Sequence, residues 1–426
     1  MTHKNEWAKR PPMGWNSWDC YGASVNEEQV RGNAKYMAEN LKEYGWEYVV
    51  VDIEWSQPDP DGWDYRPFTD LCMDEYSRLI PAVERFPSAA DGKGFALLAE
   101  YVHSLGLKFG IHIMRGIPRQ AVHRNCKIKG TERTARQVAS RYSVCPWNTN
   151  MYGVDAAQEG AQAYYDSLFE LYASWGVDFV KVDDIANTEF KPHDPYSAEK
   201  EIELIRNAID KCGRAIVLSL SPGPAPVDHA WHLCENANMW RMTGDFWDGW
   251  KQLYNVFERC EKWAAYVGNG CWPDGDMLPL GWLLAAQPEN AHMTKFTKDE
   301  QLTLINQWCL FRSPLMMGGE MRKNDDFTLA LMKNADALYI NQHGTSPKQL
   351  FRNENEAGWT NTDDKGRQYI GLYNLSDTPR VVKTDAAKTG TAYKDVWSRK
   401  TVTAEDLKQG IELQPHASIL VMQEDC

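Results

Sequence analysis

Acidic side chains follow several apolar or β-branched runs of the chain, at the point where each run stops. The clearest cases are Asp52 in YVVVDIEW, Asp183 in DFVKVDD and Asp245 in MWRMTGD. Further acids of this kind, and two cations close to them, are Glu54, Asp184, Asp274, Asp276, Lys181 and Arg241. Such a group, with tryptophans beside it, is typical of a site that cleaves glycosidic bonds, because this reaction needs one carboxylate as the nucleophile and another as the acid and base. Each single acid could instead cap the helix that follows it.

A scaffold that brings strand ends together must position these acids. The predicted strands lie at 13–18, 48–55, 108–114, 178–184, 215–221 and 239–245, and the predicted helices between them at 27–45, 93–106, 160–176 and 198–213. Two less legible units cover 262–290 and 300–322. This alternation indicates βαβ units and a parallel sheet. Together the units predict an α/β fold of the (β/α)8 TIM barrel type, whose chemistry lies at the C-terminal ends of the strands.

The pattern changes near residue 335. YIGLYNL (369–375), RVVKT (380–384) and SILVMQE (418–424) are short strand-like runs separated by turn residues, without helices between them. Such runs are typical of a small antiparallel β-domain. We therefore predict a catalytic barrel over residues 1–334 and a C-terminal β-sandwich over residues 335–426.

Composition and charge narrow the possible partners. The net charge is −13 without a basic run, which argues against nucleic acid or an anionic membrane. The chain has 18 Trp and 19 Tyr residues, and aromatic-rich surfaces often stack against sugars. We find no apolar signal segment at the N-terminus and no CxxC pair among the 10 cysteines. A cytoplasmic protein with free thiols is the simplest expectation, and a homo-oligomer stays possible.

Five longer motifs follow one another along the chain. They are PPMGWNSWDCYG (11–22), FVKVDD (179–184), WRMTGDFWDGW (240–250), PDGDMLPLG (273–281) and CLFRSPLMMGGEMRK (309–323). Together they resemble glycoside hydrolase family 27, the α-galactosidase and α-N-acetylgalactosaminidase family, over the whole chain. The resemblance implies an exo-acting glycosidase with a retaining double displacement that uses no metal and no cofactor.

The resemblance also implies roles for individual residues. The aspartate of the family's KxD motif is the nucleophile and falls on Asp183, with Lys181 beside it to favour the charged carboxylate. The family's acid and base falls on Asp245. The positions that match sugar-contacting residues of the family are Trp18, Asp52, Arg241 and Asp276, with Trp18 as the platform under the apolar face of the sugar.

The end of the second predicted strand departs from the family pattern. The family's α-galactosidases commonly carry two adjacent aspartates there, which bind hydroxyls on the O4 and O6 side of galactose, but here Ile53 follows Asp52. Ile53 offers O6 no acceptor, and an unpaired buried hydroxyl is costly. β-L-Arabinopyranose has the stereochemistry of α-D-galactose but lacks C6. We therefore predict a β-L-arabinopyranosidase acting on plant-type oligosaccharides or glycosides, with an α-galactosidase as the alternative.

Three further positions leave alternatives open. If the strand stays regular to Trp55, Glu54 shares a face with Asp52 and could bind O6, while Ile53 points away as ordinary core. Ser221 stands where family α-galactosidases often have glutamate, and a small residue there leaves room for a 2-acetamido group, as in the N-acetylgalactosaminidases. His112 stands where relatives often have tyrosine, and either binds a sugar hydroxyl or is a packed histidine.

Two other classes of protein are weaker alternatives. A barrel metal hydrolase would use aspartates and histidines as ligands, and the candidate histidines are His112, His229 and His232. However, the first predicted strand lacks the HxH pair expected of that class. A non-catalytic sugar-binding protein would have lost one catalytic acid, but both are present.

Secreted relatives often have a cysteine just after the nucleophile. Asp184 stands there instead, so Cys145 is expected to be unpaired.

Overall fold

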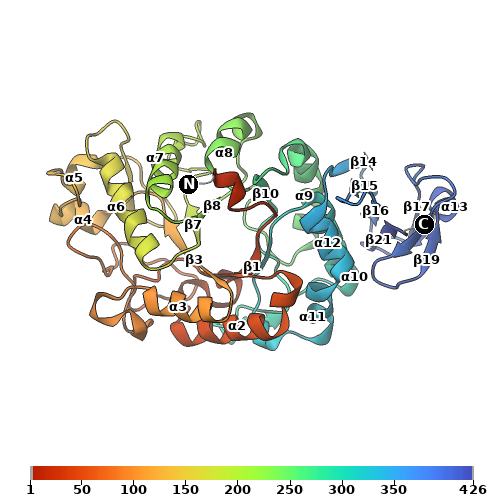
Figure 1. Ribbon diagram of the computed structural model, residues 1–426, viewed down its shortest axis with the longest axis horizontal. Coiled ribbons are helices and arrows are strands. Elements are labelled where there is room, and N and C mark those ends of the chain that lie inside the picture. Colours follow the sequence, from red (N-terminus) through yellow and green to blue (C-terminus); the bar gives the residue numbers. More distant parts are fainter. Residues whose placement is uncertain (1–2, 425–426) are drawn as a thin grey trace.

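Eight parallel strands form the central sheet of the larger part of the molecule (Figure 1). In this computed structural model, which describes residues 3–424, they are β1 (Met13–Asn16), β2 (Tyr48–Val51), β3 (Lys108–Met114), β7 (Phe179–Asp183), β8 (Val217–Leu220), β9 (Met239–Arg241), β10 (Trp272–Asp274) and β13 (Leu315–Met317). Their order in the sheet is β10-β9-β8-β7-β3-β2-β1-β13. A parallel bridge between Leu278, just after β10, and Met317 of β13 joins the two ends. The sheet therefore closes into the predicted TIM barrel.

The strand sequences are almost continuously apolar because both faces of the sheet are covered. Tyr48 and Val50 of β2 pack in a small core inside the barrel with Phe179 of β7. Val49 and Val51 of the same strand pack in the large core between the sheet and the helices. The alternation of inner and outer side chains along a strand explains how one short run serves both cores.

Helices surround the barrel in Figure 1. The main ones are α2 (Glu27–Asn40), α3 (Ala96–Ser104), α6 (Ala161–Ser174), α7 (Glu199–Lys211), α8 (Ala230–Asn236), α9 (Trp250–Trp263), α10 (Lys298–Phe311), α11 (Asp326–Lys333) and α12 (Ala335–His343). Short 3₁₀ turns occupy Lys4–Glu6, Gly22–Ser24, Lys42–Tyr44, Pro87–Gly92, Val227–His229, Ala264–Tyr266 and Met321–Lys323. Capping boxes begin α2 at Asn26 and α10 at Thr297, where a side chain satisfies free backbone N–H groups of the first turn. Among residues 3–424, no helix has the length and apolar content needed to cross a membrane.

The segment between β3 and α6 has a structure that was not predicted from the sequence. It contains β4 (Ile117–Pro118), β5 (Ala139–Ser140) and β6 (Met151–Val154), in the antiparallel order β4-β6-β5, with helices α4 (Arg119–Arg124) and α5 (Ala135–Val138). A two-residue strand is too short to produce a period in the sequence. In Figure 1 these two helices lie at the end of the molecule away from the C-terminal strands. We call this region the β4–β6 insertion.

An antiparallel β-sandwich follows the barrel, as predicted. Its larger sheet has the order β14-β15-β16-β21-β18-β19, and β17 pairs with β20 in a second sheet. The strands are β14 (Lys348–Arg352), β15 (Glu356–Thr362), β16 (Gln368–Asn374), β17 (Arg380–Val382), β18 (Ala392–Asp395), β19 (Thr401–Thr403), β20 (Ile411–Leu413) and β21 (Ser418–Gln423), and α13 covers Ala404–Gln409. Ile370, Val382 and Leu413 share one buried apolar cluster. The domain boundary at residue 335 stays a prediction. Helix α12 begins at this residue and lies between the barrel and the first strand of the sandwich.

Two predicted strands end earlier than expected, and this changes which side chains can meet. β1 ends at Asn16, so Trp18 begins the short helix α1 (Trp18–Tyr21). β2 ends at Val51, so the alternation expected of a strand regular to Trp55 is wrong. The reason is local, because the Oγ of Ser17 accepts the backbone N–H of Asp52 at 2.9 Å in place of a ladder bond. The less legible units contain β11 (Trp282–Leu283) besides β10 and β13, and β12 (His292–Met293) lies between the two units.

Candidate active site

A cavity of about 350 Å³ opens where the barrel strands end. This volume suits a ligand of the size of one or two sugar units rather than a metal ion alone. The predicted site residues that line it are Trp18, Asp52, Lys181, Asp183, Arg241, Asp245 and Asp276. The predicted site residues outside this lining are Ile53, Glu54, His112 and Ser221. The strand ends of β2, β7 and β9 therefore bring most of the predicted group together.

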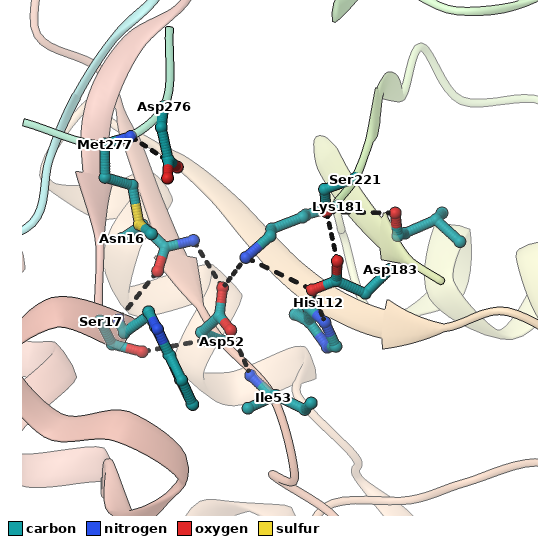
Figure 2. Close-up of polar contacts among 12 residues, drawn as sticks. Asn16, Ser17, Asp52, Ile53, His112, Lys181, Asp183, Ser221, Asp276 and Met277 are labelled. Atoms are coloured by element: carbon teal, nitrogen blue, oxygen red, sulfur yellow. Dashed lines mark hydrogen bonds and ion pairs between the residues drawn. The ribbon is translucent and has the colours of Figure 1, made fainter. Parts of the chain in front are cut away.

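Lys181 joins the acids that follow β2 and β7. Its Nζ lies 3.0 Å from Oδ2 of Asp52 and 3.6 Å from Oδ2 of Asp183 (Figure 2). Parallel pairing places β2 and β7 on either side of β3, so both carboxylates emerge at the same edge. One buried ammonium thus faces two carboxylates. Burial alone would lower the pKa of Lys181, but the two acids outweigh it and raise the pKa above the usual value.

Asp183 is held by two further side chains. The Nε2 of His112 lies 2.9 Å from its Oδ2, and the Oγ of Ser221 donates to its Oδ1 at 2.7 Å (Figure 2). Burial would raise the pKa of Asp183, but Lys181, His112 and Ser221 outweigh it and keep the pKa well below the usual range. Asp183 is therefore a buried carboxylate that stays charged, as a nucleophile requires.

Asp52 has a full set of partners. Its Oδ2 accepts from Nδ2 of Asn16 at 2.7 Å, and its Oδ1 accepts the backbone N–H of Ile53 at 2.9 Å. Burial opposes the charge on Asp52, yet Lys181 and these donors outweigh it and lower its pKa. The side chain is a fixed anion at the wall of the cavity.

Ile53 lies in an apolar cluster behind this wall. Its side chain is 2% exposed and belongs to a cluster with Ala23, Met114, Cys145 and Met151. Aromatic residues that line the cavity, Trp18, Tyr65 and Trp147, pack against the same cluster. The region after Asp52 is therefore apolar.

Glu54 is turned toward a neighbouring loop. Its backbone is left-handed, with φ of 64°, and its Oε1 accepts from the Nδ2 atoms of Asn148 at 3.0 Å and Asn150 at 3.2 Å. Burial raises the pKa of Glu54 to about 7. Because the strand has ended and the chain turns here, Glu54 does not follow the face of Asp52 as strand alternation would require.

Arg241 binds two acids on the opposite wall. Its Nη2 lies 2.7 Å from Oδ2 of Asp276 and 3.1 Å from Oδ1 of Asp245. The side chains of Arg241 and Asp276 are buried, whereas that of Asp245 is 68% exposed. Asp276 also accepts the backbone N–H groups of Phe246 and Met277. Asp245 is thus held near one buried cation but stays open to solvent at the mouth of the cavity.

Several cavity residues escaped the sequence analysis. They are Asp19, Tyr65, Trp147, Glu189 and Trp247. The ring of Tyr65 stacks on Trp18 at 6.0 Å between centroids and lies 5.6 Å from Trp147. Both aromatic residues come from long loops without periodicity, so the high aromatic content was their only signal. Asp19 follows Trp18 in the motif PPMGWNSWDCYG, and burial raises the pKa of Asp19 well above the usual value.

The acid after the nucleophile faces away from the cavity. Asp184 is left-handed, with φ of 57°, and its carboxylate lies 2.5 Å from Nη2 of Arg115. Arg115 also binds Glu201 at 2.8 Å. Cys145 is a free thiol, as predicted, and so are the other cysteines within residues 3–424, while Cys426 lies outside the described residues.

The histidines considered as metal ligands do not meet in the cavity. His112 is bound to Asp183, and His232 lies on α8 with its Nδ1 2.9 Å from the hydroxyl of Tyr196. Among residues 3–424, Glu199, Glu203 and His232 are close enough to share a metal ion, but none of them lines the cavity. The geometry of the cavity is that of a carboxylate site.

The chain is similar to known α-galactosidases and to a β-L-arabinopyranosidase. The family model described as alpha galactosidase A matches residues 150–343. A crystal structure of a GH27 β-L-arabinopyranosidase variant from Geobacillus stearothermophilus, in complex with arabinose, is 54% identical, with a TM-score of 0.94 over 100% of this chain and 99% of that chain. Alpha-galactosidase 2 of Arabidopsis thaliana is 26% identical over 98% of this chain and 90% of its own length. Alpha-galactosidase A of Cellvibrio japonicus is 28% identical over 79% of this chain and 68% of its own length.

Proposed function

Because the chain belongs to glycoside hydrolase family 27 and is a glycoside hydrolase, we propose that it releases terminal β-L-arabinopyranose from plant-type oligosaccharides or glycosides. The similar enzyme from Geobacillus stearothermophilus is a β-L-arabinopyranosidase and is 54% identical to this chain, whereas alpha-galactosidase 2 of Arabidopsis thaliana is 26% identical. This difference in identity favours the pentoside.

The observation that carries the proposal is the apolar region after Asp52. Asp52 is a fixed anion suited to a sugar hydroxyl such as O4, while Ile53 contributes only alkyl surface to the cluster behind the wall. Neither Ile53 nor Glu54 lines the cavity directly, and the carboxylate of Glu54 is engaged by two asparagines. An O6 hydroxyl brought to this side would lose its bonds to water without a new acceptor, at a cost of about 1–3 kcal/mol. A pentopyranoside lacks C6 and avoids this cost.

The proposed mechanism is a retaining double displacement. Asp183 attacks the anomeric carbon and forms a glycosyl ester, while Asp245 gives its proton to the departing glycosidic oxygen. Asp245 then takes a proton from water, and the resulting hydroxide displaces Asp183 and restores the free carboxylate. The low pKa of Asp183 keeps the nucleophile charged. The exposure of Asp245 lets the leaving group, and then the attacking water, reach its carboxyl group.

The test is kcat/KM on three aryl glycosides, the β-L-arabinopyranoside, the α-D-galactopyranoside and the α-N-acetylgalactosaminide. We expect the wild-type enzyme to prefer the pentoside. Ile53→Asp adds an acceptor beside Asp52, so the ratio of galactoside to pentoside activity should rise about tenfold or more, in line with the cost of an unpaired hydroxyl. Ile53→Val is the matched control and should leave this ratio unchanged. A wild-type preference for the galactoside would reject the proposal.

A second candidate is an α-galactosidase, which the activity of the Arabidopsis thaliana and Cellvibrio japonicus relatives favours. In that case Ile53 is only core, and its replacement by Asp should lower both activities together. Activity on the N-acetylgalactosaminide would instead point to room beside Ser221.

A further inference from the structure

A second cavity, of about 640 Å³, lies beside the β4–β6 insertion and outside the active site. Four arginines and a histidine line it, and these are Arg119, Arg124, Arg136, Arg141 and His123. Among the described residues of its wall, Asp70 is the single acid. The whole chain has a net charge of −13, so composition alone does not explain a local excess of cations.

The four guanidinium groups lack carboxylate partners within residues 3–424. Arg119 donates to the carbonyl of Thr149 at 2.9 Å, and Arg136 donates to the carbonyl of His123 at 2.8 Å. These two bonds fix the direction of both side chains without neutralising their charge. Arg124 and Arg141 are exposed, and their side chains form no hydrogen bond or ion pair with the described residues. The cavity thus holds two anchored and two adjustable cations.

An apolar surface adjoins these cations. The guanidinium carbon of Arg119 lies 4.4 Å from the ring centroid of Phe68 and 5.1 Å from that of Tyr152. Phe68 is 75% exposed, so its ring is open to a ligand. A ring-shaped organic molecule with a negative group would meet both features.

We propose that this cavity binds a small anion of the carboxylate or phosphate class, carried on a sugar ring. Planar guanidinium groups present paired N–H donors that match the oxygens of either group. The ring would lie against Phe68 while the negative group meets the arginines. Two sources of such an anion are an acidic sugar unit of the glycan substrate and a free phosphate compound.

The same two loops contribute residues to both cavities. Tyr65 and Trp147 line the active site, while Phe68 and Thr149 line the arginine-rich cavity. Three residues span at most about 11 Å of extended chain, so these parts of the two linings are close. The acidic-sugar source rests on the proposed function, because it requires a glycan in the active site; binding of a free anion does not.

The experiment is isothermal titration calorimetry at fixed ionic strength with glucuronate, glucose 6-phosphate and, as the neutral control, methyl glucoside. The test variant is the double substitution Arg124→Gln and Arg141→Gln. The matched control is Lys129→Gln with Arg133→Gln, which removes two charges from the same insertion, where they pair with Glu170 and Glu159 outside the cavity.

We expect saturable binding of at least one anion, at least tenfold weaker in the test variant and unchanged in the control. Binding of glucuronate alone assigns the site to an acidic sugar, whereas binding of glucose 6-phosphate assigns it to a sugar phosphate. Absence of saturable binding, or equal loss in both variants, would overturn the proposal. Because no turnover is measured, a wrong glycosidase substrate would leave this result unaffected.

Discussion

The Nε2 of His112 lies 2.9 Å from Oδ2 of Asp183, in a pair that is almost entirely buried. A charged carboxylate can only accept hydrogen bonds, so Nε2 carries the proton and donates it. The Oγ of Ser221 bonds the other oxygen. Two side chains that the sequence analysis placed around the sugar therefore fix the orientation of the nucleophile.

Replacement of His112 should slow the reaction without preventing folding. His112→Phe keeps a ring but loses the donor, and a hydrogen bond to a charged group is worth about 1.5–3 kcal/mol, so kcat should fall roughly 10- to 100-fold. The pKa of Asp183 should rise, because His112 helps to lower it. The acid limb of the pH profile should then move to higher pH. His112→Gln retains an N–H at similar reach and should recover most activity; an unchanged acid limb in His112→Phe would contradict this role.

Replacement of Asp245 should make the rate depend on the leaving group. Asp245→Ala removes the proposed acid, which matters most when the departing oxygen is strongly basic. We expect a loss of at least 100-fold in kcat/KM on an alkyl glycoside and a much smaller loss on a dinitrophenyl glycoside. Asp183→Ala should abolish both activities equally. NMR of the first product should show retained configuration, and an inverted product would reject the double displacement.

The barrel was predictable because its strands are covered on both faces. Runs such as Tyr48–Val51 must be apolar throughout to serve an inner and an outer core, and this leaves a clear signal in the sequence. The short strands of the β4–β6 insertion leave no such signal, since two residues define no period.

The catalytic group was predictable for a related reason. Parallel strands end at one edge, so acids that follow them must gather there, as Asp52 and Asp183 do around Lys181. The direction of each side chain was not predictable. Glu54 turns away because its backbone enters the left-handed region, and no local residue pattern marked that turn. Tyr65 reaches the cavity from a loop whose path depends on tertiary packing.

The stability of the protein should depend on the ionisation of Glu54. Burial raises its pKa to about 7 in the folded state from an ordinary 4.5, so the folded protein binds the proton more tightly. The contribution to stability is fully present below pH 4.5 and is lost as the pH rises through 7, by roughly 3 kcal/mol. Glu54→Gln keeps an acceptor for Asn148 and Asn150 but does not titrate. The difference in urea unfolding free energy between Glu54→Gln and wild type should therefore grow between pH 4.5 and 7.5, and a constant difference would refute this prediction.

Loss of Arg115 should be among the most destabilising single changes near the site. Its guanidinium is 1% exposed and neutralises both Asp184 and Glu201, so Arg115→Met leaves two buried carboxylates without a cation. Breaking such a buried pair costs about 3–5 kcal/mol, because the remaining charge cannot recover its water. Lys262→Met is the control, since Lys262 pairs with Glu258 on the same helix, α9, and both side chains are more than half exposed; it should cost less than about 1 kcal/mol. Urea unfolding measures the loss of unfolding free energy in the two variants. Similar losses would contradict the prediction, because they would mean that Asp184 and Glu201 become protonated or rehydrated when Arg115 is removed.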